Sequence, residues 1–212
     1  MNTIIDRFNN VKSIINNNNV QIVAVSKTFS FEYISPLVDF GHIHFGENKV
    51  QEAHSKWSEI KRKNKKIQLH MIGKLQSNKA KVATILFDYI HSLDNQKLAD
   101  TLSKCENVIN KKNKYFIQVN VGKEKQKSGI EPEILDDFFY YCSKQLKLNV
   151  IGLMAIPPAD GNTEKHFKYL SEANQSLGLK ELSIGMSSDF ENAIKFKSTF
   201  VRIGTSIFGS RT

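Results

Sequence analysis

Residues 20–45 read VQIVAVSKTFSFEYISPLVDFGHIHF and contain the unit that decides the fold. The β-branched and apolar run over residues 20–26 predicts a buried strand. The segment 31–40 places its apolar residues on one helical face, and Gly41 favours the end of that helix. A second apolar run begins at His42. A strand, a helix and another strand in this order indicate a βαβ unit with parallel strands.

The same alternation continues through the chain. Apolar runs predict eight strands, at residues 20–26, 42–45, 67–72, 89–93, 115–121, 150–156, 181–184 and 200–203. Helical spacing fills the segments between them, at residues 31–40, 48–60, 78–86, 96–108, 133–146, 164–177 and 189–196. Units of this kind, joined by right-handed crossovers, favour a single (β/α)8 TIM barrel over residues 1–212. The alternative is an open doubly wound sheet, which requires a topological switch point.

An additional helix precedes the first strand. Residues 3–15 have helical spacing, and residues 16–19 form a polar Asn-rich linker. Because this helix has no strand before it, we expect it to cover the bottom or the side of the barrel. Residues 1–19 are thus the N-terminal helix and linker of one domain.

Composition excludes several classes of protein. The chain has 212 residues, of which 40% are hydrophobic and 24% are charged, a balance typical of soluble globular proteins. It lacks the ~20 consecutive apolar residues of a membrane-spanning helix, and residues 1–10 do not resemble a secretory signal. Cys105 and Cys142 form neither a disulfide framework nor a metal-binding spacing. We therefore expect a cytoplasmic protein without a membrane or metal partner.

The formal net charge is 30 − 21 = +9, which suggests an anionic partner such as nucleic acid. Much of this charge lies in residues 61–66 and around Lys111, Lys112 and Lys114. Cations are favourable near the carboxyl ends of helices, and no aromatic platform is interleaved with the basic run. We therefore expect solvated helix ends and no nucleic-acid contact.

A lysine follows the first predicted strand. In a TIM barrel the chemistry lies at the carboxyl ends of the strands, and Lys27 comes directly after the apolar run 20–26. A lysine that is partly desolvated at this place favours the neutral, nucleophilic amine. The alternative is an ordinary surface lysine at a strand end.

The loops after the seventh and eighth strands predict an anion site. Ser187 and Thr205 supply hydroxyl groups, and the amides of Gly204 and Thr205 lie at a predicted helix start. In barrels these two loops usually bind phosphate. Together with Lys27 they indicate a phosphate-bearing carbonyl compound held as a Schiff base, and pyridoxal 5′-phosphate matches that description.

Six separated motifs carry a resemblance to a known family. They are residues 24–28 (AVSKT), 45–52 (FGENKVQE), 72–79 (IGKLQSNK), 152–154 (GLM), 185–189 (GMSSD) and 201–209 (VRIGTSIFG). In this order they resemble the pyridoxal phosphate homeostasis protein family over nearly the whole chain. The resemblance implies a single-domain barrel similar to the N-terminal half of bacterial alanine racemase.

The resemblance also implies a role for individual residues. It places the cofactor on Lys27 as a Schiff base, its phosphate on Ser187, Gly204 and Thr205, its pyridine nitrogen at Arg202, and its ring beside Asn48 and Met186. Because a guanidinium only donates hydrogen bonds, Arg202 would keep the ring nitrogen unprotonated. The ring is then a poorer electron sink than it would be with a carboxylate partner.

Two histidines are candidate metal ligands. His42 and His44 lie two residues apart on a predicted strand and would face the same way. Since no carboxylate or cysteine joins them at ligand spacing, we expect a packing or rim role and no metal site.

The resemblance implies a protein that carries pyridoxal 5′-phosphate and serves its homeostasis without catalytic turnover. The alternative is an amino-acid racemase, which needs an acid or base on each face of the substrate. In two-domain racemases a tyrosine from the second domain supplies one of these groups. A chain of 212 residues predicts no such domain, and we identify no catalytic residue. The expected partners are the cofactor and the apo-enzymes that receive it, and we expect a monomer.

Overall fold

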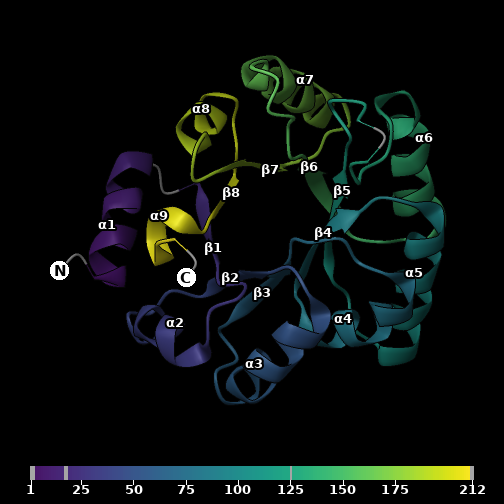
Figure 1. Cartoon of the computed structure of the whole chain (residues 1–212). Helices are drawn as coiled ribbons and strands as arrows, with labels where there is room; N and C mark the ends of the chain where they lie inside the picture. The colour runs from purple at the N-terminus through teal and green to yellow at the C-terminus, as the bar shows by residue number, and fades with distance from the viewer. Residues whose placement is uncertain (1–2, 17–18, 125, 211–212) are drawn as a thin grey trace.

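The computed structural model describes residues 3–16, 19–124 and 126–210. Its eight strands are β1 (Gln21–Val25), β2 (His44–Glu47), β3 (Gln68–Met71), β4 (Tyr89–Leu93), β5 (Lys114–Gln118), β6 (Val150–Met154), β7 (Glu181–Met186) and β8 (Phe200–Ile203). All neighbouring strands are parallel, and β8 pairs with β1, so the sheet closes into a barrel (Figure 1). The predicted TIM barrel is confirmed, and the closure excludes an open sheet.

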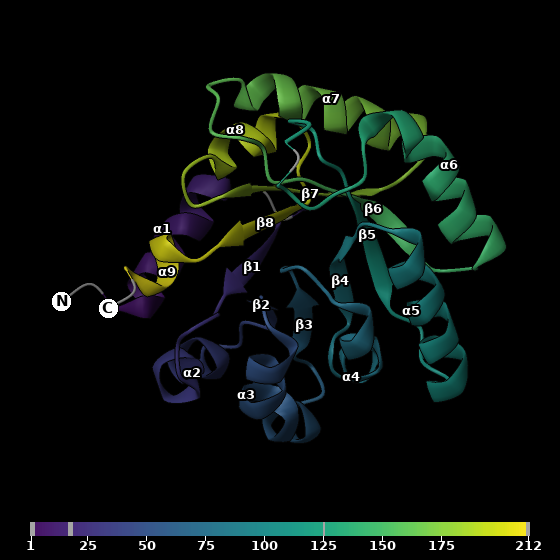
Figure 2. The same ribbon diagram turned by 45° about the vertical axis from the view of Figure 1, so that its right-hand side comes forward.

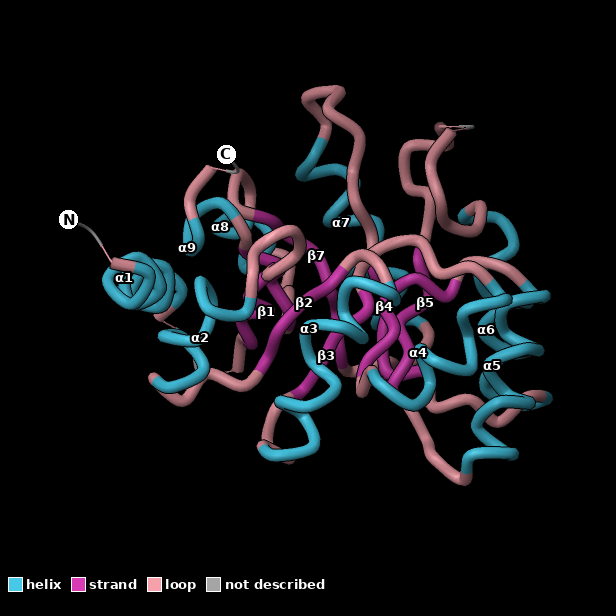
Figure 3. Tube along the Cα trace, turned by 60° about the horizontal axis from the view of Figure 1, so that its bottom comes forward, coloured by secondary structure: helices cyan, strands magenta, loops and turns pink. Residues whose placement is uncertain are grey.

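Helices surround the strands (Figure 2). They are α1 (Ile4–Ile15), α2 (Phe31–Asp39), α3 (Val50–Lys63), α4 (Ala80–Leu86), α5 (Gln96–Ile109), α6 (Leu135–Tyr140), α7 (Thr163–Ser176), α8 (Phe190–Lys195) and α9 (Thr205–Phe208). Short 3₁₀ segments at Ser77–Lys79 and Pro132–Ile134 and a π-helical segment at Tyr141–Gln145 complete the ring. Figure 3 shows the strands in the centre of the molecule and the helices outside.

Several predicted boundaries differ from the structure by one to three residues, and two of the differences have a clear local description. The strand predicted to end at Val121 ends at Gln118, because the chain then bonds to its own loop. There the Asn120 amide donates to the Ile130 carbonyl at 2.8 Å, and the Ile130 amide donates to the Gln118 carbonyl at 2.9 Å. The helix predicted over 133–146 changes from 3₁₀ to α to π geometry along its length.

The additional helix α1 covers the side of the barrel. Thr3 caps it, since its hydroxyl accepts the Asp6 amide at 3.1 Å and its amide donates to the Asp6 carboxylate at 2.9 Å. The buried face packs against α9, α8 and α2, and Arg7 Nε donates to the Ile207 carbonyl at 2.6 Å. Because α9 has only four residues, α1 occupies the place beside it in the outer ring (Figure 1).

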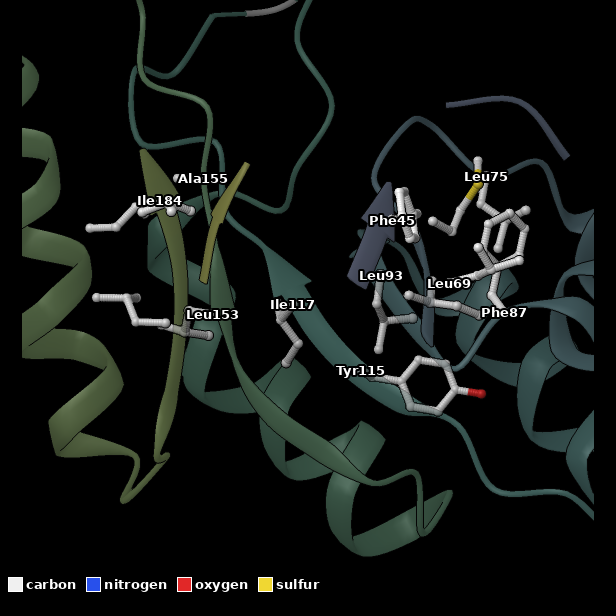
Figure 4. Packing of buried hydrophobic residues seen from close by; sticks show 14 of the residues in the cluster. Phe45, Leu69, Leu75, Phe87, Leu93, Tyr115, Ile117, Leu153, Ala155 and Ile184 are labelled. Carbon is white, nitrogen blue, oxygen red and sulfur yellow. The ribbon is translucent and has the colours of Figure 1, made fainter. Parts of the chain in front are cut away.

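The main hydrophobic core lies between the strands and the helices. Phe45, Leu69, Phe87 and Tyr115 belong to it and point away from the barrel axis (Figure 4). A smaller apolar cluster lies inside the barrel, formed by Val23, Tyr89, Phe116, Met154 and Phe200.

Part of the basic charge belongs to the fold. Lys61 Nζ donates to the Leu86 carbonyl at 2.7 Å and pairs with Asp88. Lys111 Nζ donates to the carbonyls of Thr84 and Phe87 at 2.8 and 2.6 Å, and burial lowers the pKa of Lys111 to about 8. Both cations therefore lie at the carboxyl end of α4, where they oppose its dipole.

No helix in the described ranges combines the length and the apolar character that a bilayer crossing requires.

Candidate functional site

The predicted site residues follow strands that are neighbours in the barrel. Because β1 pairs with both β2 and β8, and β8 pairs with β7, the carboxyl ends of these four strands form a continuous arc. Lys27 follows β1, Asn48 follows β2, Ser187 follows β7 and Gly204 follows β8. Tertiary structure thus brings to one end of the barrel residues that are far apart in the sequence.

Lys27 lies half-buried in a turn next to a strained residue. Thr28 has a φ of 70°, in the left-handed region that β-branched residues rarely adopt. The Thr28 amide donates to Glu52 Oε1 at 2.5 Å, which holds this conformation from α3. Backbone strain of this kind concentrates at functional sites, where the surroundings over-determine it.

A buried carboxylate holds the other neighbour of Lys27. Glu47, at the end of β2, is fully buried, and its Oε1 accepts hydrogen bonds from Ser26 Oγ at 2.8 Å, Lys56 Nζ at 2.9 Å and Trp57 Nε1 at 2.9 Å. Lys56 also donates to the Ser26 carbonyl at 2.8 Å. The Lys56 ammonium therefore compensates the buried negative charge and ties α3 to the chain before Lys27.

This network of Glu47, Glu52 and Lys56 was not predicted from the sequence. Lys56 Nζ lies 3.2 Å from Glu52 Oε1, so one ammonium links the carboxylates that hold Ser26 and Thr28. Glu47 and Glu52 lie within the motif 45–52, and their position in it was the available signal. Lys56 lies outside that motif and required the structure.

The ends of β7 and β8 meet at a cluster of backbone amides. Ser187 Oγ accepts the amides of Gly204 and Ser206 at 3.3 and 3.4 Å, so two N–H groups at the start of α9 face the β7 loop. Thr205, between them, is exposed. This convergence of amides and a hydroxyl suits an anion such as a phosphate group.

Glycine is required where the β7 loop begins. Gly185 has a φ of +92°, and a Cβ there would lie 2.6 Å from the Ala193 Cβ. The Met186 amide donates to Asp189 Oδ1 at 2.6 Å, which closes the turn that contains Ser187. The β8 loop also contacts the first strand, since a Cβ at Gly204 would lie 3.5 Å from the Val25 Cβ.

Arg202 lies inside the barrel and is 4% exposed. Its Nη1 donates to the Ser183 carbonyl and hydroxyl, both at 2.7 Å, and its Nη2 donates to the Ala155 carbonyl at 2.9 Å. Burial lowers the pKa of Arg202 to about 10, and the nearby Asp189 carboxylate opposes that shift. The guanidinium therefore stays charged at neutral pH.

The remaining two predicted residues border the same end. Met186 is half-buried and stands beside Arg202 in the register of β7 and β8. Asn48 is half-buried after β2, and the Gly73 backbone packs closely against it, since a Cβ at Gly73 would lie 2.4 Å from the Asn48 carbonyl oxygen.

A chain of polar side chains runs down the barrel interior from Arg202. Ser183 Oγ lies 2.9 Å from His91 Nδ1, His91 Nε2 lies 2.9 Å from His70 Nδ1, and His70 Nε2 lies 2.9 Å from His44 Nδ1. Burial lowers the pKa of His44 to about 4 and holds the pKa values of His70 and His91 well below their ordinary range. The line of histidines was not predicted from the sequence, although each of the three lies on a predicted strand.

The expectation that His42 and His44 face the same way is wrong. His42 precedes β2 and packs against Phe8 and Phe45 outside the barrel, whereas the His44 ring lies beside His70 inside it. Within the described ranges no three His, Cys, Asp or Glu residues gather as a metal site.

Two hollows lie at the opposite end of the barrel. One of about 330 Å³ is lined by Tyr89, Lys114 and Phe200, among others, and one of about 530 Å³ also reaches His44. These residues belong to the amino ends of the strands, so both hollows are separate from the arc that contains Lys27.

Known proteins match this chain along its whole length. The sequence family described as alanine racemase, N-terminal domain, matches residues 1–212. A pyridoxal phosphate homeostasis protein of Aquifex aeolicus is 39% identical over 203 residues, which cover 92% of this chain and 88% of the relative. One from Vibrio cholerae is 40% identical over 202 residues, covering 91% and 86%.

Solved structures give the same result. PipY of Synechococcus elongatus, solved with PLP bound, superimposes with a TM-score of 0.89 at 34% identity, over 98% of this chain and 100% of PipY. An alanine racemase of Clostridium difficile superimposes with a TM-score of 0.79 at 13% identity, a likeness of fold that covers 57% of that enzyme. This chain therefore belongs to the alanine racemase N-terminal domain family and, within it, to the pyridoxal phosphate homeostasis proteins.

Proposed function

We propose that this protein binds pyridoxal 5′-phosphate at the carboxyl ends of β1, β2, β7 and β8 and serves the homeostasis of that cofactor. The observation that carries the proposal is the convergence of Lys27, Arg202 and the amides facing Ser187 on one arc of the barrel. Two relatives that are 39 and 40% identical are named pyridoxal phosphate homeostasis proteins, and PipY was solved with PLP bound.

Lys27 is the residue proposed to hold the cofactor covalently. Its amine would supply the nucleophile that holds the aldehyde carbon of the cofactor as an imine, with the aldehyde oxygen released as water. The hydrogen bonds of Ser26 and Thr28 hold the turn on both sides of Lys27, which supports this role because a pre-positioned amine loses less freedom on bonding.

Ser187, Gly204 and Thr205 are proposed to bind the phosphate. The Gly204 and Ser206 amides already face Ser187 Oγ, so they offer two donors without rearranging the backbone. A formal net charge of +9 adds a general attraction for an anionic ligand.

Arg202 is proposed to face the pyridine nitrogen, with Asn48 and Met186 beside the ring. As a guanidinium, Arg202 only donates, so it would hold the ring nitrogen of a bound cofactor as an unprotonated acceptor. When bound, the cofactor supplies a reactive aldehyde and an electron-poor ring. An unprotonated ring nitrogen beside Arg202 makes the ring a weaker electron sink.

The side chains at the site favour a carrier over a racemase. Racemisation needs an acid or base on each face of the substrate, and Lys27 can serve one. Four tyrosine hydroxyls in the described ranges have hydrogen-bond partners, namely Tyr33 with Phe208, Tyr89 with Lys114, Tyr115 with Glu106 and Tyr141 with Asp100, and none of these partners is a proposed site residue. We therefore propose binding without turnover, and transfer of the cofactor to apo-enzymes that need it.

Borohydride trapping tests the proposal directly. The purified protein is incubated with pyridoxal 5′-phosphate, reduced with borohydride, digested and mapped by mass spectrometry. We expect the cofactor on the peptide containing Lys27, and its loss in Lys27→Ala. Lys74→Ala is the matched control, because Lys74 is an exposed lysine that follows β3 at the same end of the barrel.

Labelling of Lys74 or of several lysines equally, with Lys27→Ala unaffected, would overturn the assignment.

A second measurement addresses catalysis. The loaded protein is incubated with L- and D-alanine, and we expect no inversion above a protein-free solution of the cofactor. Rapid inversion that depends on Lys27 would establish the racemase alternative instead.

A further inference from the structure

The interior of the barrel holds a continuous line of hydrogen-bonding groups. It starts at Arg202 and passes through Ser183, His91 and His70 to His44, with contacts of 2.7, 2.9, 2.9 and 2.9 Å. It thus runs from β8 and β7 across to β4, β3 and β2. His44 lines hollows at the amino end of the strands, so the line connects the two ends of the barrel.

Arg202 fixes the direction of the first hydrogen bond in this line, and the buried Ser183 proton sets the direction of the others. A guanidinium has no acceptor, so the Ser183 hydroxyl must accept from it. In the described part of the chain the one other hydrogen-bond partner of that hydroxyl is His91 Nδ1. Since Ser183 is fully buried and an unpaired hydroxyl proton there is costly, we assign His91 Nδ1 as the acceptor of that proton. A neutral His91 then carries its proton on Nε2.

The proton on His91 Nε2 in turn sets the hydrogen bonds between the three histidine rings. His91 Nε2–H donates to His70 Nδ1, which leaves the His70 proton on Nε2, and this proton is donated to His44 Nδ1. All three rings are thus neutral Nε2–H tautomers, with their lone pairs directed toward Arg202. The aligned rings stabilise the guanidinium, whose positive charge lies in the barrel interior.

The surroundings favour neutral rings. The His70 ring stacks on Tyr89 with centroids 4.2 Å apart, and the His91 ring stacks on Phe116 at 4.3 Å. The charged groups that face the chain are mainly positive: Arg202 beside His91, Lys61 near His70, and Lys114 near His44 with Asp88 opposing it. A proton on any ring would add a second buried positive charge.

We infer that His44, His70, His91 and Ser183 are positioning residues, which form a hydrogen-bonded chain polarised by Arg202 and hold its guanidinium toward the ring of the bound cofactor. In this hydrogen-bonded line Arg202 carries the positive charge, and the three histidine rings remain neutral. Arg202 thus meets the ring nitrogen as a donor. This inference rests on the proposed function only for the identity of the ligand that Arg202 meets.

The tautomers can be observed in the full chain without cofactor. In protein labelled with 15N-histidine, NMR reports which nitrogen of each ring carries a proton. We expect Nε2–H and an unprotonated Nδ1 for His44, His70 and His91 at neutral pH, with exposed His54 as the reference ring. A proton on Nδ1 of any of the three chain histidines would overturn the inference, because it reverses the hydrogen bonds.

Ser183→Ala removes one link of the chain and leaves the charge of Arg202 in place. We expect the largest change at His91 Nδ1, a smaller one at His44, and about tenfold weaker binding of pyridoxal 5′-phosphate. Ser183→Thr restores the hydroxyl and is expected to restore both readouts. A hydroxyl with a merely structural role would lower stability without weakening the binding of the cofactor.

Unchanged His91 resonances and unchanged cofactor affinity in Ser183→Ala would contradict the inference. If Ser183→Ala does not fold, the tautomers of the unmodified protein still decide. Failure of the proposed function looks different, because the cofactor would then not be trapped on Lys27 while the histidine tautomers remained as expected.

Discussion

The two sides of the barrel wall are built on different principles. The outer side, between strands and helices, is apolar, with Phe45, Leu69 and Tyr115 fully buried in one large cluster. The inner side holds a small apolar cluster beside the line from Arg202 to His44. Neighbouring residues of one strand serve both, since Phe45 faces outward and His44 inward.

This difference separates stability from function. The outer layer holds most of the buried apolar residues, and such a core tolerates exchanges between apolar residues best when their volume is kept. The inner layer depends on particular donors and acceptors, because a buried polar group without a partner is costly. Four experiments test this division, from the largest expected effect to the smallest.

Trp57→Ala is expected to lower the free energy of unfolding by about 3–5 kcal/mol. Trp57 is fully buried against Phe45 in the outer layer, and its indole N–H also donates to Glu47. Urea unfolding followed by circular dichroism measures the change. Val108→Ala is the control, because Val108 is 80% exposed. Equal effects of the two substitutions would contradict the assignment of Trp57 to the core.

Acid is expected to destabilise the protein through its buried histidines. Burial lowers the pKa of His42 to about 4 from an ordinary value of 6.5, so the unfolded chain binds the proton first as the pH falls. The contribution of His42 and His44 to stability is then constant above pH 6.5 and decreases between pH 6.5 and 4, by roughly 1.4 kcal/mol per pH unit for each of them. Below pH 4 these two histidines are protonated in both states, and their part of the loss stops.

Unfolding measured across this pH range checks the slope. His42→Phe places an apolar ring beside Phe8 and Phe45 and is expected to make the dependence shallower by one proton. If His42→Phe leaves the pH dependence of the free energy of unfolding unchanged, His42 does not contribute to the acid destabilisation.

His70→Leu is expected to lower the free energy of unfolding by about 1–3 kcal/mol. The substitution retains an apolar side chain of similar size but leaves His91 Nε2 and His44 Nδ1 without their partner. Thermal and urea unfolding measure the loss, and His54→Leu is the exposed control. A stabilised His70→Leu protein would mean that the inner layer follows the same rule as the outer one.

Lys168→Ala is expected to produce no measurable change in stability. Lys168 and Glu172 form a 4.0 Å ion pair on α7 with side chains that are 68 and 67% exposed, and water screens such pairs. Urea unfolding at low and high salt tests this. A salt-dependent decrease in the free energy of unfolding of Lys168→Ala would contradict this expectation and show that surface ion pairs contribute to stability.

The agreement between sequence and structure follows the same division. Each strand was predicted because the outward residues of a parallel barrel are apolar whatever their partners, as in the run 20–26. Helix starts at Thr3 and Asn95 were predictable because a cap is a contact within one turn. The division of the 133–146 segment was missed, since no local signal marks a change from α to π geometry.

The site was only partly predictable. Lys27, Ser187, Gly204 and Arg202 were predicted as site residues because they follow or end strands at one face of the barrel, and motifs mark them. The partners of Ser26 were missed, since Glu47 reaches it from the next strand and Lys56 from a helix. The contact between Arg202 and Ser183 was missed for the same reason.

The sequence by itself determined the number of strands, the order of helices and the family, because these depend on periodicity and on short motifs. Tertiary structure alone decided that α1 lies on the side of the barrel and that His44 belongs inside while His42 lies outside. It also decided which donor meets which acceptor. The physical reason is register: hydrogen bonds between strands join atoms at about 3 Å, and only the closed barrel sets those distances.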